Sequence, residues 1–181
     1  MVQFTMIIRK ATEQDGQEIS EVYKCAFPKD EGDIVANLAV NLLSESTIPE
    51  TLSLVAEVKN SIVGHVAFSP VSAADMTDFQ GYILAPLAVR PKFQHSGIGS
   101  KLVEAGILKL SGTEIDVLFV YGDPNYYNKF GFSVELAGGF TPPYKLQYPS
   151  GWQAKSMKSP AVPYTNVALN CVSSLCDPLL W

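Results

Sequence analysis

The sequence is short of charge, of cysteine and of long apolar runs, and each shortage excludes a class of protein. Charged side chains make up 17% of the 181 residues, below the roughly 25% of an average soluble domain, so we expect a ligand or partner to cover apolar surface. No uninterrupted apolar stretch is nearly as long as the about 18 residues that a helix needs to cross a bilayer. Cys25, Cys171 and Cys176 are odd in number and lack the CxxC spacing of a zinc or redox site, which predicts three reduced thiols.

The charges that are present lean towards acid. Lys and Arg number 13 against 18 Asp and Glu, a net charge of −5. This balance argues against nucleic acid as a partner, because such binders normally present a basic face. Arg9, Lys10, Glu13 and Asp15 stand where a secretion signal would need its apolar core. We therefore expect a cytoplasmic protein with no membrane partner.

Local patterns predict an α/β domain of mixed element order. We expect strands at residues 6–10, 51–58, 62–69, 82–89, 117–121 and 132–136. We expect helices at residues 12–27, from 29 onward, at 98–110 and at 125–130. Pro86 interrupts the fourth strand and should weaken its pairing, because proline cannot donate to a sheet ladder. The last 45 residues are rich in turn-forming residues and show one short strand, near 152–157.

The strongest site signal is Gln94-His95-Ser96-Gly97-Ile98-Gly99, between a predicted strand and an amphipathic helix. Glycine lets a ligand approach the backbone, and a helix start presents unpaired N–H groups that suit a pyrophosphate. On the hexapeptide alone, a plain glycine turn stays open as an alternative. A P-loop would need Gly at Gln94, and a Rossmann fingerprint starting at Gly97 would need Gly or Ala at Leu102, so both motifs fail.

Three motifs in register resemble the GNAT superfamily, the acetyl-coenzyme A-dependent N-acetyltransferases. They are Pro86-Leu87-Ala88-Val89-Arg90-Pro91, then Gln94-x-x-Gly97-x-Gly99, then Gly122-Asp123-Pro124-Asn125-Tyr126-Tyr127-Asn128-Lys129-Phe130-Gly131-Phe132. The element order also fits from Met6 to about Leu136, and the tail matches only loosely. The resemblance implies a GNAT core at residues 1–136, with residues 137–181 as an extension packed on the same domain. It implies a mostly antiparallel central sheet, helices on both faces, and a V-shaped splay between the fourth and fifth strands.

The resemblance also implies how acetyl-coenzyme A is bound. Backbone N–H groups of the phosphate loop and the following helix start would hold the pyrophosphate, with the Ser100 side chain as a further donor. The exposed backbone of Leu87, Ala88 and Val89 would pair with the pantetheine arm. A backbone N–H there could stabilise negative charge on the thioester oxygen. The implied phosphate-binding residues are Gln94, His95, Ser96, Gly97, Ile98, Gly99 and Ser100.

Tyr127 stands four residues before Gly131, where GNAT enzymes often keep a tyrosine as general acid. A departing thiolate, with an ordinary pKa of about 8.5, benefits from a nearby O–H donor. The alternative is that Tyr127 only packs against the cofactor. Tyr126 is interpreted as structural, and Asn125 either binds the cofactor or caps its helix.

The sequence does not identify the general base that a protonated amine requires. Glu57 lies on a predicted strand, where it is more often solvated. His65 lies on another strand, where a histidine is more often structural, and His95 belongs to the phosphate loop. None of the three is nominated.

The acceptor is also not identified. In the family, specificity comes from the region joining the first two helices and from loops beyond the last core strands, here residues 28–33 and 140–152. The acids Asp30, Glu31 and Asp33 either attract a cationic amine or simply stabilise a helix start. The aromatic residues of the second region either line an acceptor pocket or cover the sheet; they are Phe140, Tyr144, Tyr148 and Trp152.

The functional prediction is an acyltransferase that moves acetyl from acetyl-coenzyme A to a primary amine by direct attack on the thioester. The alternatives are a non-catalytic acyl-coenzyme A sensor with the same fold and a nucleotide-binding module. No metal site is expected. The apolar residues at the end of the chain are candidates for a homodimer contact; they are Leu175, Leu179, Leu180 and Trp181.

Overall fold

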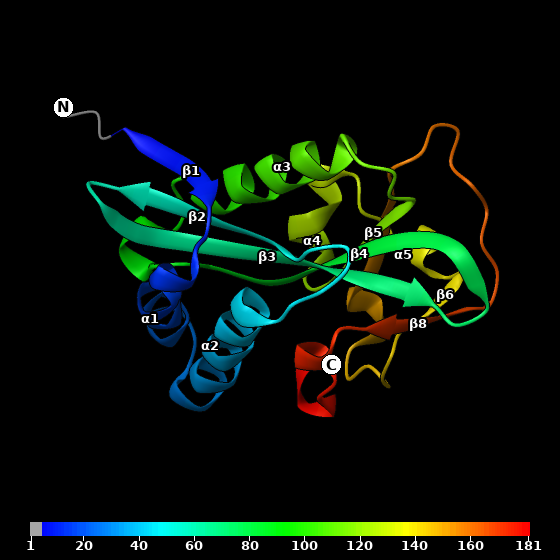
Figure 1. Ribbon diagram of the computed structural model, residues 1–181, viewed down its shortest axis with the longest axis horizontal. Coiled ribbons are helices and arrows are strands. Elements are labelled where there is room, and N and C mark those ends of the chain that lie inside the picture. Colours follow the sequence, from blue (N-terminus) through cyan, green and yellow to red (C-terminus); the bar gives the residue numbers. More distant parts are fainter. Residues whose placement is uncertain (1–4) are drawn as a thin grey trace. The chain divides into compact units, whose positions relative to one another are not determined.

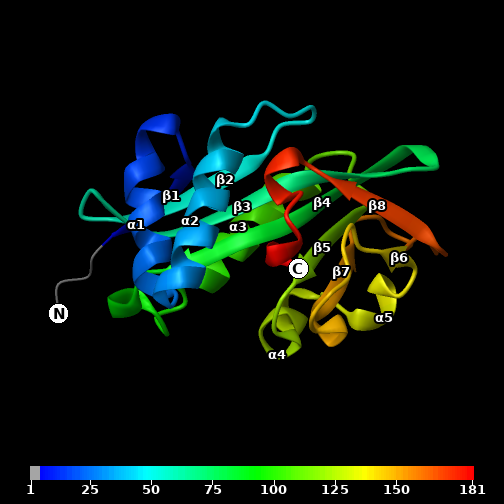
Figure 2. The ribbon, with the colours of Figure 1, turned by 90° about the horizontal axis from the view of Figure 1, so that it is seen from below.

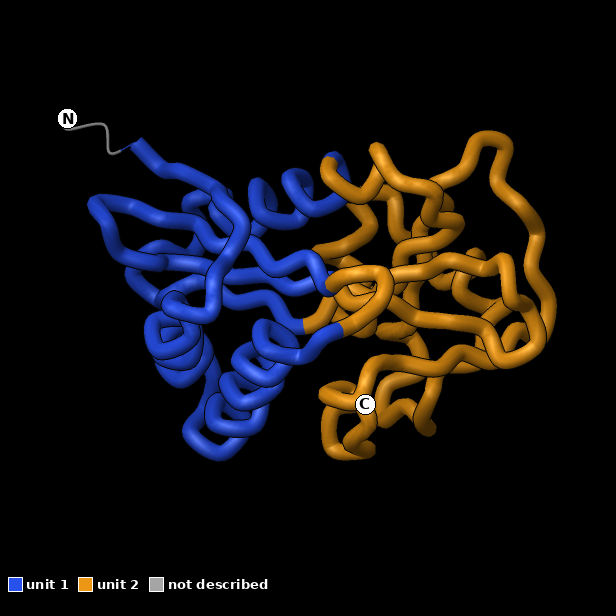
Figure 3. The backbone as a smooth tube through the Cα atoms, viewed as in Figure 1, with its two compact units in different colours: residues 1–46, 51–68, 86–108 blue, residues 47–50, 69–85, 109–181 orange. Residues whose placement is uncertain are grey.

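The computed structural model describes residues 5–181, and the chain divides into two compact units, each described here by itself (Figure 3). Unit 1 contains the described residues up to Ser46, together with Thr51–Phe68 and Pro86–Leu108. Unit 2 contains Thr47–Glu50, Ser69–Ala85 and Lys109–Trp181.

The described residues form a mixed α/β fold with a mostly antiparallel sheet of eight strands. The strands are β1 (Met6–Lys10), β2 (Leu52–Val58), β3 (Ser61–Ala73), β4 (Met76–Val89), β5 (Val117–Tyr121), β6 (Phe140–Thr141), β7 (Trp152–Ser156) and β8 (Val167–Cys171). The helices are α1 (Gly16–Ala26), α2 (Lys29–Ser44), α3 (Ile98–Ser111), α4 (Pro124–Tyr127) and α5 (Val134–Ala137). The strand order is β1-β2-β3-β4-β5-β7, and β8 pairs with β3 and β6. The pairs β4–β5 and β6–β8 are parallel, whereas β1–β2, β2–β3, β3–β8 and β5–β7 are antiparallel. Within the described part of the chain, no helix has the length and apolarity to span a membrane.

In unit 1 the helices cover both faces of the strands. Figures 1 and 2 show α1 and α2 side by side on one face, with α3 on the other. The α1–α2 face buries an apolar cluster that includes Ile19, Val22, Tyr23, Ala36, Ala39, Val55, Ile62 and Ala88. On α2, Leu38 and Leu42 are buried, whereas Ile34 is 39% exposed.

A hairpin joins β2 to β3, the strands expected at residues 51–58 and 62–69. Lys59 and Asn60 form a two-residue turn with φ of 50° and 62°, the left-handed conformation that matches the twist of antiparallel strands. Thr12 and Asp15 form a capping box, in which the Asp15 carboxylate accepts from Thr12 N–H at 2.7 Å. Arg9 donates to both carboxylate oxygens of Asp15, which holds the Asp15 pKa down at about 2.

Two glycines let α3 approach β3 closely. A methyl group on Gly64 of β3 would lie 3.0 Å from Cδ1 of Leu102 on α3, and a methyl group on Gly106 of α3 would overlap the ring of Phe68 on β3. Phe68 and Leu102 are themselves fully buried. The contact therefore depends on the missing side chains at these two positions.

A polar triad lies in the core of unit 1. His65 is fully buried, with Nδ1 2.7 Å from the Tyr23 hydroxyl and Nε2 2.7 Å from the Ser53 hydroxyl. The Tyr23 hydroxyl also donates to the His65 carbonyl oxygen at 3.3 Å. Because burial disfavours the imidazolium, the His65 pKa falls to about 3. His65 is thus a neutral structural residue, as its position on a strand suggested.

Unit 2 is organised around β5. Residues Gly81–Leu84 of β4 pair in parallel with Val117–Val120, and β7 pairs antiparallel with β5 on its other side. Phe119 stacks on Trp152 with ring centroids 5.2 Å apart and meets Phe140 edge-on at 4.8 Å. The splay expected between β4 and β5 stays a prediction, and so does the division at residue 136.

The prediction of a strand at residues 132–136 is wrong. Ser133 forms a single bridge with Ala154, and α5 then begins because the Ser133 hydroxyl accepts from Leu136 N–H at 3.2 Å. A serine cap therefore overrides the strand-forming side chains around it. The expected strand near 152–157 is confirmed as β7, whereas β8 was missed.

The end of the chain packs on unit 2. Leu175 and Trp181 are 2% and 7% exposed, and the Trp181 indole donates to the Leu175 carbonyl oxygen at 3.0 Å. Leu179 is 78% exposed. Two of the four apolar residues considered for a dimer contact are therefore buried within the chain, and the dimer itself stays a prediction.

The glycine contact between α3 and β3 makes a stability prediction. We expect Gly106→Ala to lower the free energy of unfolding by about 1–3 kcal/mol, because the added methyl group overpacks the core against Phe68. Chemical denaturation measures the change. Gly112→Ala is the matched control, since its methyl group would meet only Lys109 O at an ordinary 3.6 Å. Equal stability of the two variants would contradict the close contact.

The buried imidazole makes a pH prediction. Between pH 6.5 and about 3 the unfolded chain binds a proton at His65 that the folded chain does not. The free energy of unfolding therefore decreases by about 1.4 kcal/mol for each unit by which the pH is lowered. Protonation of Asp15 lowers the free energy of unfolding further only below its unfolded pKa of 3.8. We expect His65→Gln to lose this slope between pH 6.5 and about 4.5, measured by urea unfolding. His95→Gln, at an exposed position, should retain it; identical slopes for all three proteins would refute the prediction.

Candidate active site

The loop between β4 and α3 is anchored at its start and braced inside. The Arg90 N–H donates to Val63 O and its Nε to Ile62 O, both at 2.8 Å. The Gln94 side chain donates to Val89 O at 2.9 Å, and the Gln94 N–H donates to Pro91 O at 3.3 Å. Gln94 thus holds the loop against the end of β4.

The loop then turns twice through the left-handed region before α3 begins. His95 has φ of 59° and Gly97 has φ of 84°, and residues 94–97 are exposed. Alternating backbone hands of this kind turn successive N–H groups towards one side, which makes a concavity for anions. The Ser96 hydroxyl donates to Phe93 O at 2.5 Å. The loop is therefore held in this shape by its own hydrogen bonds.

The start of α3 adds further donors. Lys101 N–H donates to Gly97 O at 3.0 Å and closes the first turn. The N–H groups of Ile98 and Gly99 precede that bond and have no intrahelical acceptor. A methyl group on Gly97 would meet no heavy atom within 4 Å, so space lies open in front of the turn. The geometry suits a phosphate or pyrophosphate.

Leu87, Ala88 and Val89 form the last residues of β4 in unit 1. Ala88 is 5% exposed and packs in the α1–α2 cluster, whereas Leu87 and Val89 are half-buried. The Val89 carbonyl oxygen is already taken by Gln94. These positions lead directly into the anion-binding turn through Arg90.

Tyr127 belongs to unit 2, on α4 just beyond the end of β5. Its ring contacts Tyr126 edge-on at 5.0 Å and Phe132 at 5.9 Å. A methyl group on Gly122 would lie 2.6 Å from its Cε2, so the ring rests against bare backbone. Burial raises the Tyr127 pKa well above its usual value of 10. The phenol is therefore protonated at neutral pH, the state that a hydrogen-bond donor needs.

Asp123, and not Asn125, caps α4. The Asp123 carboxylate accepts from Asn125 N–H at 2.9 Å and from the Asn125 side-chain amide at 3.1 Å. The capping role considered for Asn125 is thus wrong, because the capping side chain must precede the helix. The Asn125 side chain is exposed, which leaves its second role as a prediction.

A clamp that the sequence did not reveal holds the end of β5. Gln153 on β7 is 1% exposed, and its amide donates to Gly122 O at 3.1 Å and to Gly151 O at 3.3 Å. The Tyr148 N–H donates to the Tyr121 hydroxyl at 2.8 Å. The clamp fixes Gly122, against which Tyr127 packs. Because β7 also contains Lys155 and Ser156, no sequence pattern marked Gln153.

The structure separates the remaining candidates for a base. Glu57 forms an ion pair with Arg9 at 2.9 Å, and His65 is buried and neutral. His95 is exposed on the anion-binding turn. None of these three presents an unengaged, buried base, so none is assigned that role.

In the regions expected to recognise the acceptor, the structure decides between the alternatives for only some of the residues. Phe140 and Trp152 pack on Phe119 and cover the sheet, while Tyr148 is 64% exposed. The acids at the start of α2, Asp30, Glu31 and Asp33, are all exposed, and Asp33 lies 3.8 Å from the Lys24 ammonium group. Their exposure agrees with a helix-start role as well as with attraction of a cation.

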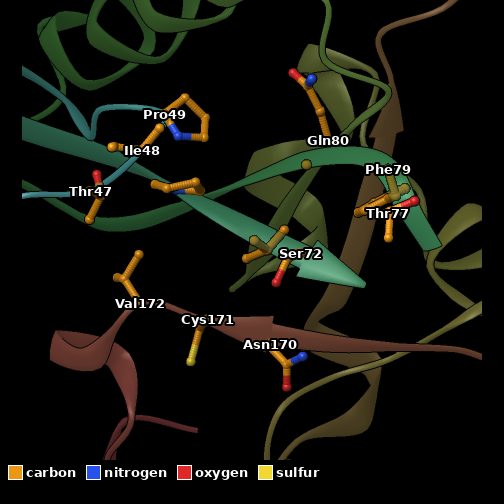
Figure 4. A pocket seen from close by; sticks show the side chains of 13 residues that line it. Thr47, Ile48, Pro49, Ser72, Thr77, Phe79, Gln80, Asn170, Cys171 and Val172 are labelled. Atoms are coloured by element: carbon orange, nitrogen blue, oxygen red, sulfur yellow. The ribbon is translucent and has the colours of Figure 1, made fainter. Parts of the chain in front are cut away.

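Unit 2 also contains a cavity of about 370 Å³ that the sequence did not predict (Figure 4). Uncharged side chains line it, from Thr47–Pro49, the ends of β3 and β4, and Asn170–Val172. Gly81 in its wall pairs with Val117, the first residue of β5, whereas Tyr127 follows the last. At about 3.3 Å per residue, the five-residue strand separates the cavity from the Tyr127 end by about 13 Å.

Comparison with known proteins places this geometry in a family. The family model described as an acetyltransferase (GNAT) domain matches residues 49–134. The N-acetyltransferase YjhQ of Escherichia coli K12, described as uncharacterised, is 36% identical over 149 residues, 79% of this chain and 80% of that protein. YhbS of the same strain, also described as uncharacterised, is 33% identical over 130 residues, 71% of this chain and 74% of that protein.

Solved structures of similar fold agree with the sequence relatives. The crystal structure of Escherichia coli YhbS in complex with coenzyme A superposes with a TM-score of 0.78 at 26% identity and covers 94% of this chain and 92% of that one. A GNAT acetyltransferase from Brucella melitensis in complex with acetyl-coenzyme A gives a TM-score of 0.68 at 31% identity, covering 95% and 99%. With the left-handed turn before α3, the mixed sheet and these relatives together, the chain belongs to the GNAT family of N-acetyltransferases.

Proposed function

We propose that the protein transfers an acetyl group from acetyl-coenzyme A to a primary amine. The amine nitrogen attacks the thioester carbonyl carbon, so that a C–N bond forms and the C–S bond breaks. The proton lost by the nitrogen is balanced by the proton gained by the sulfur. The observation that carries the proposal is the braced left-handed turn at Gln94–Gly97 leading into α3.

The turn and the start of α3 are proposed to bind the pyrophosphate. His95, Ser96 and Gly97 offer backbone N–H groups on the turn, and Ile98 and Gly99 offer them at the helix start. Ser100, the next residue, is proposed as a further contact of the cofactor. The open space beside Gly97 fits a bulky anion. Gln94 contributes by bracing, because both its N–H and its side-chain amide are engaged within the loop.

The end of β4 is proposed to hold the pantetheine arm. Leu87 and Val89 are half-buried, and Ala88 between them is anchored in the core. Backbone amides on a rigid strand can pair with the amides of an extended ligand as an added strand does. A backbone N–H from these residues is then available to stabilise charge on the thioester oxygen.

Tyr127 is proposed to donate a hydrogen bond to the departing sulfur. Its raised pKa keeps the phenol protonated, but also makes complete proton transfer to a thiolate of ordinary pKa about 8.5 unfavourable. Tyr127 is therefore proposed to stabilise the departing sulfur through a hydrogen bond without losing its own proton. The proton that the sulfur finally gains comes from the amine. Asn125, exposed two residues earlier in the chain, is proposed as a further cofactor contact.

The proposed phosphate site makes a binding prediction. We expect Gly97→Ala to weaken coenzyme A binding about tenfold, because φ of 84° costs a residue with a side chain about 1–2 kcal/mol. Isothermal titration calorimetry with coenzyme A measures the loss. Binding of pantetheine, which lacks the phosphates, should be unchanged. Equal weakening of both ligands would place the phosphates elsewhere.

The proposed role of Tyr127 makes a kinetic prediction. We expect Tyr127→Phe to lower kcat by about 10²-fold with little change in coenzyme A affinity, because the lost hydrogen bond acts mainly in the transition state. Thiol release from acetyl-coenzyme A with a panel of amines measures turnover. Tyr126→Phe, the neighbouring phenol, should change kcat far less.

Two results would count against the proposal. An unchanged rate in Tyr127→Phe would remove that residue from the reaction. Coenzyme A binding by the unmodified protein without turnover of any amine would instead indicate an acyl-coenzyme A sensor.

A further inference from the structure

Two cysteines five positions apart bring their sulfur atoms together in unit 2. The Sγ atoms of Cys171 and Cys176 lie 3.7 Å apart. Cys171 is half-buried and Cys176 is exposed, whereas the third thiol, Cys25, belongs to α1 in unit 1. A disulfide requires an S–S distance of about 2.05 Å, which rotation about the side-chain bonds can supply.

The backbone holds both cysteines in place. Cys171 ends β8 and pairs with Val71 on β3. Cys176 follows a tight turn in which its N–H donates to Ser173 O at 3.0 Å, and the Trp181 indole donates to Leu175 O of the same turn. The two sulfurs therefore meet because of tertiary and turn structure, and not by chance approach of loose loops.

A tyrosine supports thiolate chemistry at this pair. Desolvation, together with its interaction with the nearby thiols of Cys176 and Cys171, raises the pKa of the Tyr144 hydroxyl. A phenol that remains protonated can donate to a thiolate, the form in which cysteine reacts with oxidants. The Tyr144 ring also lies 6.1 Å from Trp181.

We propose that Cys171 and Cys176 are a redox-active dithiol that closes to a reversible disulfide when a peroxide oxidises it. Peroxide converts one thiol to a sulfenic acid and releases water. The second thiol attacks that sulfur, the S–S bond forms, and a second water leaves. The two sulfurs together lose two electrons and two protons, and the peroxide is reduced.

The disulfide would close a six-residue ring beside the cavity. Figure 4 shows Cys171 on β8 with its sulfur directed away from the ends of β3 and β4, so the bond would form outside the cavity wall. The ring spans the turn on which Trp181 rests. Oxidation would therefore tie the end of the chain to β8 without blocking the cavity.

Mass spectrometry tests the proposal on the whole protein. No Lys or Arg follows Lys158, so trypsin places both cysteines on the peptide of residues 159–181 and leaves Cys25 elsewhere. After treatment with hydrogen peroxide and alkylation, we expect this peptide to be about 2 Da lighter, unalkylated, and restored by dithiothreitol. A non-reducing gel should show the protein still as a single chain.

Matched variants separate the pair from ordinary surface thiols. Cys25→Ser should form the disulfide as the unmodified protein does, whereas Cys176→Ser should leave Cys171 alkylated or oxidised singly. The oxidised protein should also melt at a higher temperature than the reduced one, a gain that Cys176→Ser lacks. A reduced 159–181 peptide under conditions that oxidise Cys25, or disulfides between chains, would overturn the proposal.

Discussion

The close contact of α3 with β3 is the constraint on which the rest of unit 1 depends. Gly64 and Gly106 remove the side chains that would separate helix and strand, and Phe68 and Leu102 occupy the space. Because α3 packs this closely on β3, the N–H groups at the start of α3 lie directly after the braced turn that follows β4. The anion-binding geometry is thus a consequence of core packing, with Arg90 and Gln94 adding the local bonds that keep the turn in register.

In unit 2 the same principle operates with different residues. Gly122 exposes bare backbone to the Tyr127 ring, and the buried Gln153 amide holds the Gly122 carbonyl. A missing side chain sets the position of the phenol, and a buried hydrogen bond keeps the backbone there. Burial also raises the pKa of the Tyr127 phenol, which is protonated at neutral pH even at its usual pKa of 10. In both units a residue named in a motif acts through geometry supplied by residues outside it.

Burial also distinguishes functional from structural polar groups. His65 has both ring nitrogens bound to hydroxyls inside the core and is held neutral, so it stabilises unit 1. The Cys171–Cys176 pair lies at the surface, where an oxidant reaches it. Residue type alone could not separate these cases, because histidine and cysteine serve in catalysis, in metal binding and in cores alike.

By itself the sequence determined the local elements and the family. The Lys59–Asn60 hairpin, the Thr12–Asp15 capping box and the glycine turn before α3 follow from short-range propensities and hydrogen bonds that neighbouring residues complete. The tertiary structure alone decided that Ser133 starts a helix, that β8 joins β3, that Gln153 clamps Gly122, and that two cysteine sulfurs meet. These features depend on contacts between residues far apart in the chain or on competition between a cap and a strand, and no local pattern encodes their outcome.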